Sequence, residues 1–271
     1  MKSFTCFMIT NIPKNLQKEF EQFQQKLNVF VDSSEQHVLP VKNGIKKDIL
    51  FLGATHGDEK VGVKALQRLE ESNKFDWLLA NEEAYKEGKR FLEIDMNRAA
   101  PGNIDSEKYE ERRVAEILRK FNSYNYVVDI HGTVANSGLF IILTKLSFDD
   151  LLLALQFDIP NIVIWLPKEK KATGPLVEFA QPGIEIECGP KESEAVTEEL
   201  TEKLKTFLNN YNEPITKDNL KGKSIFWVEG KIEKSSVPLK DFELTKVEGE
   251  EFYPLLVGEY GISCYKMTKI K

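Results

Sequence analysis

The chain has 271 residues, of which 41% are hydrophobic and 30% charged, and 37 Lys and Arg against 43 Asp and Glu give a formal charge of -6. This length and composition are typical of a globular protein, and they exclude a disordered chain and a bundle of membrane-spanning helices. Because basic and acidic residues are mixed in a net acidic chain, there is no electrostatic footprint for nucleic acid, and we expect a small-molecule partner.

Segments with apolar residues every three or four positions alternate with short apolar runs, the patterns of amphipathic helices and buried strands. In chain order we predict a helix over residues 16–30, a strand over 49–52, helices over 60–69 and 106–121, strands over 126–130 and 139–143, a helix over 148–155, strands over 162–164 and 183–186, and a helix over 194–211. This alternation implies an α/β fold with a mostly parallel sheet flanked by helices.

The pattern changes after Asn212-Glu213-Pro214. Short strand-like runs follow at residues 224–228, 242–247, 252–257 and 263–267, separated by Gly, Pro and charged turns. We therefore predict an α/β domain over residues 1–212 and a small β-rich C-terminal domain over residues 213–271.

Three cysteines, Cys6, Cys188 and Cys264, lie far apart in the sequence, which argues against a disulfide framework and a thiolate metal site. The apolar start over residues 1–10 is too short for a secretory signal. We expect a cytoplasmic protein with no membrane partner. The sequence leaves the oligomeric state open, a homo-oligomer included.

Two of the three histidines share one context. His56 and Glu59 stand three residues apart just after the first predicted strand, and His131 closes another apolar run. Catalytic zinc commonly takes two His and one carboxylate, and leaves its fourth position to water. A single histidine at a strand end is usually a core or loop residue, but parallel strands bring their carboxyl ends to one edge of a sheet. These three residues are therefore a candidate zinc site.

The segment Gly183–Glu187 carries two carboxylates on one face, because side chains alternate along a strand. An acidic pair within an apolar strand is costly unless it is paired or used. Either this is an edge strand whose acidic face is solvated, or one of Glu185 and Glu187 is a general base.

Five segments together resemble the aspartoacylase and succinylglutamate desuccinylase family of zinc-dependent deacylases, which are relatives of the zinc carboxypeptidases. The segments are Gly53–Glu59 with its Gly-x-His-Gly-x-Glu pattern, Asp95-Met96-Asn97-Arg98, Asp129-Ile130-His131, the polar loop Thr133–Gly138, and Ile186-Glu187-Cys188-Gly189-Pro190. The resemblance implies that His56, Glu59 and His131 bind one Zn²⁺ ion per chain. It also implies that Glu187, rather than Glu185, takes a proton from the water that zinc activates.

The resemblance assigns three further side chains. Arg90 matches the arginine that polarises the scissile carbonyl and stabilises the oxyanion. Asn97 and Arg98 match the pair that grips a substrate carboxylate, for which guanidinium offers two parallel donors. The implied activity is zinc-dependent hydrolysis of the amide of a small N-acyl amino acid or a similar carboxylate-bearing substrate.

The chain departs from aspartoacylases in three places. Gly132 replaces their Asn after the second zinc histidine, and the segment Lys171–Leu176 lacks their second substrate-gripping arginine. Lys168, Lys170 and Lys171 are the cations near that position. Tyr260 is displaced by a couple of positions from the tyrosine that the family places near its substrate. We therefore predict a weaker preference for dicarboxylic acyl-amino acids such as N-acetylaspartate than aspartoacylases show, with a preference for a neutral side chain as an open alternative.

Two other functions fit the same residues. A small zinc carboxypeptidase would use the same zinc, arginine and Glu187 chemistry on peptides with a free C-terminus. A zinc-binding or metabolite-sensing relative without turnover would keep the fold, although it would be free to lose at least one of these groups.

Overall fold

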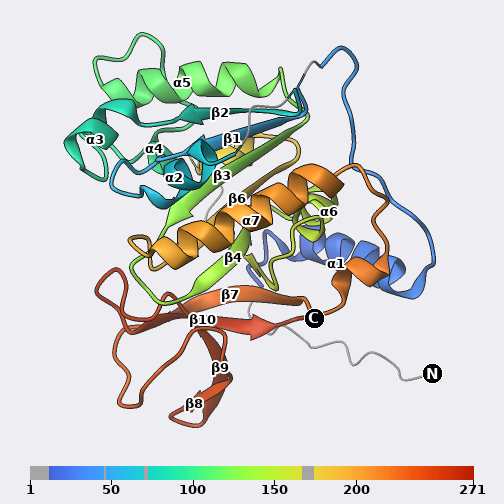
Figure 1. The fold of residues 1–271 in the computed structure, drawn as a ribbon. Coiled ribbons are helices and arrows are strands. Elements are labelled where there is room, and N and C mark those ends of the chain that lie inside the picture. The colour runs from blue at the N-terminus through green and yellow to red at the C-terminus, as the bar shows by residue number, and fades with distance from the viewer. Residues whose placement is uncertain (1–11, 46, 70–72, 167–173) are drawn as a thin grey trace.

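A computed structural model describes residues 12–45, 47–69, 73–166 and 174–271 (Figure 1). Ten strands form one sheet in the order β2-β1-β3-β6-β4-β5-β7-β10-β9-β8. The strands are β1 (Ile49–Gly53), β2 (Phe75–Leu79), β3 (Tyr126–Gly132), β4 (Gly138–Leu143), β5 (Asn161–Ile164), β6 (Gly183–Gly189), β7 (Ser224–Ile232), β8 (Thr245–Val247), β9 (Glu250–Leu255) and β10 (Cys264–Lys269). The helices are α1 (Gln17–Asp32), α2 (Val61–Gln67), α3 (Glu82–Glu87), α4 (Met96–Ala99), α5 (Tyr109–Phe121), α6 (Phe148–Leu155), α7 (Glu194–Asn210), and the 3₁₀ turns η1 (Leu176–Phe179) and η2 (Lys217–Leu220).

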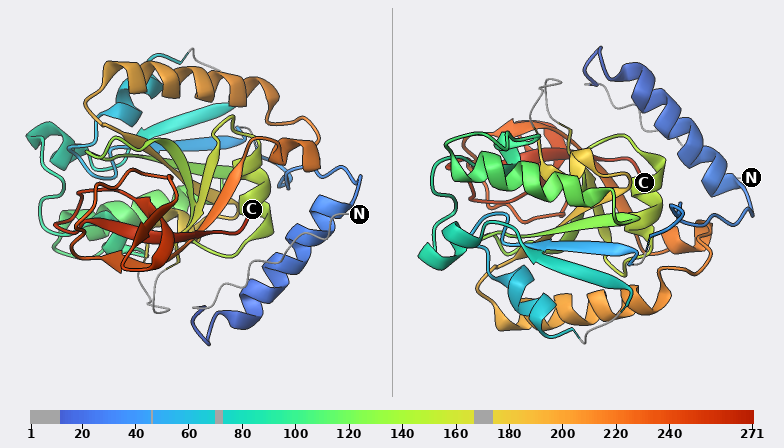
Figure 2. Two further views of the ribbon diagram at one scale, coloured as in Figure 1. Left: turned by 90° about the horizontal axis from the view of Figure 1, so that it is seen from below. Right: turned by 90° about the horizontal axis from the view of Figure 1, so that it is seen from above.

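The sheet is mostly parallel, as predicted. Strands β2, β1, β3 and β6 run parallel to one another, and β4, β5 and β7 form a second parallel group. The two groups meet where β4 runs antiparallel to β6, and β10, β9 and β8 continue the sheet with antiparallel pairings. Helices cover both faces, with α7 and α5 on opposite sides of the sheet (Figure 2). The predicted fold class is confirmed.

Side-chain alternation divides the core between the two faces of the sheet. On one face, residues such as Phe51, Val128 and Ile186 join apolar side chains of α1, α2, α6 and α7 in the largest apolar cluster. On the other face, one cluster joins β1 and β3 to α4, α5 and η1, and another joins β4 and β5 to the C-terminal strands. Polar side chains of β3 and β6 lie on this second face, between its two apolar clusters.

Helix α6 has the predicted bounds, whereas β2, α3 and α4 were not predicted. Strand β2 is only partly buried after Phe75, and α3 and α4 have six and four residues, too few for a helical periodicity. The predicted strand over 242–247 is reduced to β8 because Phe242 has a left-handed backbone with φ of 63°.

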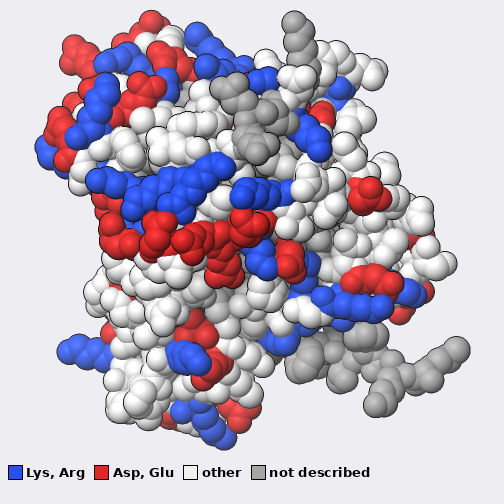
Figure 3. Space-filling view, in the orientation of Figure 1, with Lys and Arg blue, Asp and Glu red and all other residues white. Residues whose placement is uncertain are grey.

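The predicted domain boundary falls between α7 and η2, and the β5–β7 pairing continues the sheet across it. The division into two domains stays a prediction. Within the described residues, none of the helices combines the length and the apolar character needed to span a bilayer. On the face drawn in Figure 3, a band of Lys and Arg lies directly against a band of Asp and Glu, so neither charge dominates it.

Candidate active site

The loop between β1 and α2 carries His56 and Glu59, both buried. The Glu59 amide donates to the His56 carbonyl at 3.0 Å, a turn that brings the two side chains together. Gly57 is required inside this turn, because a Cβ there would lie 2.3 Å from the carbonyl carbon of Ala84 in α3. The Gly57 amide also donates to the Arg90 carbonyl at 2.9 Å, so the loop fixes the backbone of Arg90 beside the two side chains.

Strands β3 and β6 supply the other acidic and imidazole groups. His131 lies within β3 and pairs in register with Glu187 of β6, while Asp129 pairs with Glu185. Residues paired in register project from the same face, so the two carboxylates of β6 lie beside the β3 residues and not on a solvated edge.

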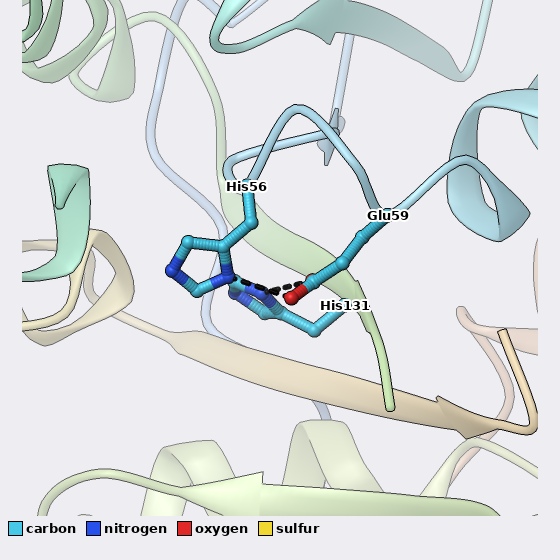
Figure 4. A group of neighbouring side chains, drawn as sticks. All are labelled: His56, Glu59 and His131. Carbon is cyan, nitrogen blue, oxygen red and sulfur yellow. Dashed lines mark hydrogen bonds and ion pairs between the residues drawn. The ribbon is translucent and has the colours of Figure 1, made fainter. Parts of the chain in front are cut away.

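His56, Glu59 and His131 converge on one point from two elements (Figure 4). Nδ1 of His56 lies 2.9 Å from Glu59 Oε1, and Nδ1 of His131 lies 3.0 Å from Glu59 Oε2. His56 Nδ1 is nevertheless buried without a hydrogen-bond partner among the described residues. The three ligand atoms lie within 4.8 Å of one another, and two imidazoles with one carboxylate make a set that suits zinc. These residues could therefore hold a metal ion.

The other ring nitrogen of each histidine faces a carboxylate. His56 Nε2 lies 3.1 Å from Asp95 Oδ1, and His131 Nε2 lies 3.1 Å from Asp129 Oδ2. Asp129 is fully buried and accepts the Thr55 hydroxyl at 2.8 and 2.9 Å. Asp95 also caps α4 by accepting the Asn97 amide at 2.9 Å. Such carboxylates hold metal-binding imidazoles in one tautomer, with Nδ1 free for the metal.

Asp129, His131 and Glu185 also lie close enough to form a second ligand group. When His131 presents Nδ1 to a metal, its Nε2 carries the proton, and this proton is directed at Asp129. The geometry therefore fits a single candidate metal site at His56, Glu59 and His131, with Asp95 and Asp129 as supporting carboxylates.

The electrostatics favour positive charge at the point of convergence. Burial lowers the pKa of both imidazoles, but nearby carboxylates outweigh this effect, so both pKa values are raised. The carboxylates are Glu59 and Asp95 for His56, and Asp129 and Glu59 for His131. Burial raises the pKa of Glu59, but the two histidines reverse this and hold it well below its usual range. A bound cation would take the place of this positive charge.

The two carboxylates of β6 behave differently from Glu59. Burial raises the pKa of Glu187 to about 8, and His131 opposes that shift while Glu59 adds to it. Burial likewise raises the pKa of Glu185 to about 7, again opposed by His131. Burial thus favours the protonated forms of Glu187 and Glu185, whereas the two histidines favour the ionised form of Glu59.

Basic and amide side chains complete the site. Arg90 Nη1 donates to Glu59 Oε1 at 2.8 Å, and its Nη2 lies 3.1 Å from His56 Nε2. Asn97 is buried and accepts the Leu176 amide at 3.3 Å, while Arg98 Nη1 donates to the Asn97 carbonyl at 2.9 Å.

All seven residues assigned from the sequence line one cavity of about 490 Å³. They are His56, Glu59, Arg90, Asn97, Arg98, His131 and Glu187. The same cavity is lined by Glu185 and by apolar and aromatic side chains of β4 and the segment after β5. The structure thus brings the predicted residues together, and their roles stay proposals.

Tyr260 lines the cavity too, although its displaced position gave no clear match in the sequence. It is 58% exposed and lies at the cavity mouth. The preceding Glu259 fixes it there, because this buried carboxylate accepts the Thr133 hydroxyl and, at 2.8 Å, the Ala135 amide. A contact between residues so far apart in the chain leaves no local pattern in the sequence.

The departure at Gly132 has a steric cause. A Cβ at Gly132 would lie 2.7 Å from Lys191 Cβ and 3.1 Å from a methyl group of Val61, so a side chain does not fit. Lys191 is held there by an ion pair with Asp58 at 2.5 Å. Lys168, Lys170 and Lys171 lie outside the described residues, as does Cys6. Cys188 and Cys264 are buried free thiols, as expected.

Known proteins resemble this chain in sequence and in fold. The family profile described as Succinylglutamate desuccinylase/Aspartoacylase catalytic domain matches residues 45–215. A probable aspartoacylase of Prochlorococcus marinus (strain AS9601) is 31% identical over 191 residues, which cover 62% of each chain. An N-acyl-aromatic-L-amino acid amidohydrolase (carboxylate-forming) of Xenopus laevis is 26% identical over 187 residues, 60% of this chain and 61% of that protein. The chain thus matches less than two thirds of the length of these relatives.

Solved structures extend the likeness beyond the matched segment. Murine aminoacylase 3 superposes with a TM-score of 0.64 and 19% identity, covering 84% of this chain and 97% of the mouse chain. At this identity the likeness establishes a common fold. Since the catalytic-domain profile covers more than half of the sequence, this chain belongs to the succinylglutamate desuccinylase/aspartoacylase family.

Proposed function

We propose that this protein is a cytoplasmic, zinc-dependent amidohydrolase that cleaves the amide of a small N-acyl amino acid. The observation that carries the proposal is the convergence of two imidazole Nδ1 atoms and one carboxylate beside a second carboxylate, Glu187, in one cavity. Family membership supports hydrolysis of an N-acyl amino acid, as the names of the relatives indicate.

In this proposal His56, Glu59 and His131 hold the zinc ion. When bound, zinc supplies a Lewis acid that polarises a carbonyl and lowers the pKa of water. Glu187 accepts a proton on its carboxylate and later delivers it to the nitrogen of the leaving amine. Arg90 is a fixed cation whose guanidinium already lies within 3.1 Å of His56 and stabilises negative charge on the substrate oxygen.

Asn97 and Arg98 would hold the substrate carboxylate, which orients the scissile amide toward Arg90 and Glu187. All four residues line the same cavity, so one small molecule can contact them together. A cavity of about 490 Å³ is within the range of small-molecule sites and suits a single acylated amino acid.

Release of free amine from a panel of N-acyl amino acids tests the proposal. The zinc-loaded protein should hydrolyse at least one of them, and the Glu187→Gln protein should be slower by about a hundredfold or more. Dipeptides in the same assay test the carboxypeptidase alternative. Stoichiometric zinc binding without hydrolysis of any compound would instead favour the sensing function.

A further inference from the structure

Two residues that line the cavity carry buried oxygen atoms to which no described residue hydrogen-bonds. Glu185 is 6% exposed and Thr144 is 2% exposed, and both line the cavity. Neither Glu185 Oε1 nor Thr144 Oγ1 has a hydrogen-bond partner among the described residues. Buried polar atoms in folded proteins are nearly always paired, so two unpaired oxygens on residues that line one cavity point to a missing partner.

The candidate metal centre does not account for Glu185. Within the described residues, the only cationic group within 4.0 Å of Glu185 is His131, whose Nε2 lies 3.8 Å from Oε1. That nitrogen is closer to Asp129, at 3.1 Å, and its single N–H is directed at Asp129 rather than at Glu185. Glu185 is therefore a buried carboxylate to which the described part of the chain donates no hydrogen bond on Oε1.

The strand register places these oxygens beyond Glu187. Glu185 precedes Glu187 by two residues in β6, about 7 Å further from the carboxyl end of the strand. It pairs with Ile142 in antiparallel β4, and Thr144 follows just after that strand. Trp165, which follows β5, lines the same cavity and packs against Tyr265, with the two ring centroids 4.4 Å apart. A carboxylate, a hydroxyl and an aromatic ring thus line the cavity beyond Glu187.

We propose that Glu185 and Thr144 form a specificity subsite for an ammonium group on the side chain of the substrate. The inference rests on the proposed deacylase function and narrows it to N-acyl derivatives of basic amino acids. An ammonium donates three hydrogen bonds and binds favourably near an indole ring, which matches the two unpaired acceptors and Trp165. A second carboxylate on the substrate offers only acceptor oxygens when ionised, so it could not donate to either of these oxygens.

The test compares two acyl amino acids of equal size. Nα-acetyl-L-ornithine and Nα-acetyl-L-norleucine differ in having a terminal ammonium or methyl group. The zinc-loaded protein should have the higher kcat/KM for the ornithine compound. Glu185→Gln should reduce the ratio of the two kcat/KM values about 10- to 100-fold, the usual effect of losing a hydrogen bond to a charged group. Thr144→Val should reduce it less, and Asp76→Asn, outside the cavity, should leave it unchanged.

An unchanged ratio in Glu185→Gln, or an equal loss for both compounds, would overturn the subsite. Binding separates this result from a failure of the proposed function, because it needs no turnover. Free L-ornithine should raise the melting temperature of the zinc-loaded protein more than L-norleucine does, and Glu185→Gln should abolish the difference. If no acyl compound is hydrolysed but this difference is found, the subsite stands and the deacylase proposal fails. If the norleucine compound is hydrolysed and ornithine has no advantage in either assay, the deacylase proposal stands and the subsite proposal fails.

Discussion

Asp129 should control how tightly His131 binds zinc. Asp129→Asn preserves the shape of a fully buried side chain and can still bond the Thr55 hydroxyl, so the variant should fold. It removes the negative charge 3.1 Å from His131 Nε2, which orients the ring and makes Nδ1 more basic. Losing such a supporting carboxylate typically weakens metal affinity by about 10- to 100-fold, or about 1.4 to 2.8 kcal/mol.

Competition against a chromogenic zinc chelator measures this change directly. Asp95→Asn provides a matched variant, because Asp95 supports His56 in the same way at 3.1 Å. Asn is as good a helix cap as Asp, so Asp95→Asn should weaken zinc binding alone, whereas Asp95→Ala should also destabilise α4 by about 1 kcal/mol. Wild-type zinc affinity in Asp129→Asn, with an unchanged melting temperature without metal, would refute the proposed support of His131.

Four further predictions concern the same site. Protein purified without chelator should contain about one zinc per chain by metal analysis, and His56→Ala or His131→Ala should remove it. Glu187→Gln should retain zinc while kcat falls by about a hundredfold or more, because only proton transfer is lost. Arg98→Lys should raise KM, because an ammonium cannot reproduce two parallel hydrogen bonds to a carboxylate. An esterified substrate should not be hydrolysed, because it lacks the carboxylate that Arg98 would hold. Gly57→Ala should lower the free energy of unfolding by about 1 to 3 kcal/mol in a denaturant titration, because its methyl group would overlap α3.

Each of these predictions has a contrary outcome. His37→Ala is the control for metal binding, since the His37 ring packs against Phe30 outside the cavity. Loss of zinc in this variant would show that the proposed location of the metal site is wrong. A larger loss of kcat in Glu185→Gln than in Glu187→Gln would reverse the assignment of the two carboxylates. Full activity on the ester would show that Asn97 and Arg98 do not hold a substrate carboxylate. A wild-type unfolding curve for Gly57→Ala would show that α3 can move away at no cost in stability.

The parts of the site that were predicted from the sequence come from strong local patterns. The apolar runs at β1 and β3 are fully buried strands, and the residues that follow or close them carry the three candidate ligands. Period-two alternation was enough to place Glu185 and Glu187 on one face. The resemblance to a family, and not the spacing alone, selected Glu187 between them.

The remaining features depend on contacts between distant segments. An apolar run such as Leu139–Leu143 has the same composition in either direction, so the sequence did not reveal that β4 runs antiparallel to β6. That direction places Thr144 beside the inner cavity. Tyr260 reaches the mouth through the contact of Glu259 with Thr133, 126 positions away, which residue patterns could not indicate.

The position of Tyr260 also has a consequence for how the protein is made. Ribosomes synthesise chains from the N-terminus, so His56, Glu59 and His131 emerge before the strand of Glu187 and well before Tyr260. A nascent chain therefore possesses every candidate metal ligand while one wall of the cavity is still missing. Tyr260 takes its place in the lining of the cavity only once Glu259 docks on Thr133 and Ala135, so the candidate ligands are made early and Tyr260 is the last part of the lining to be made.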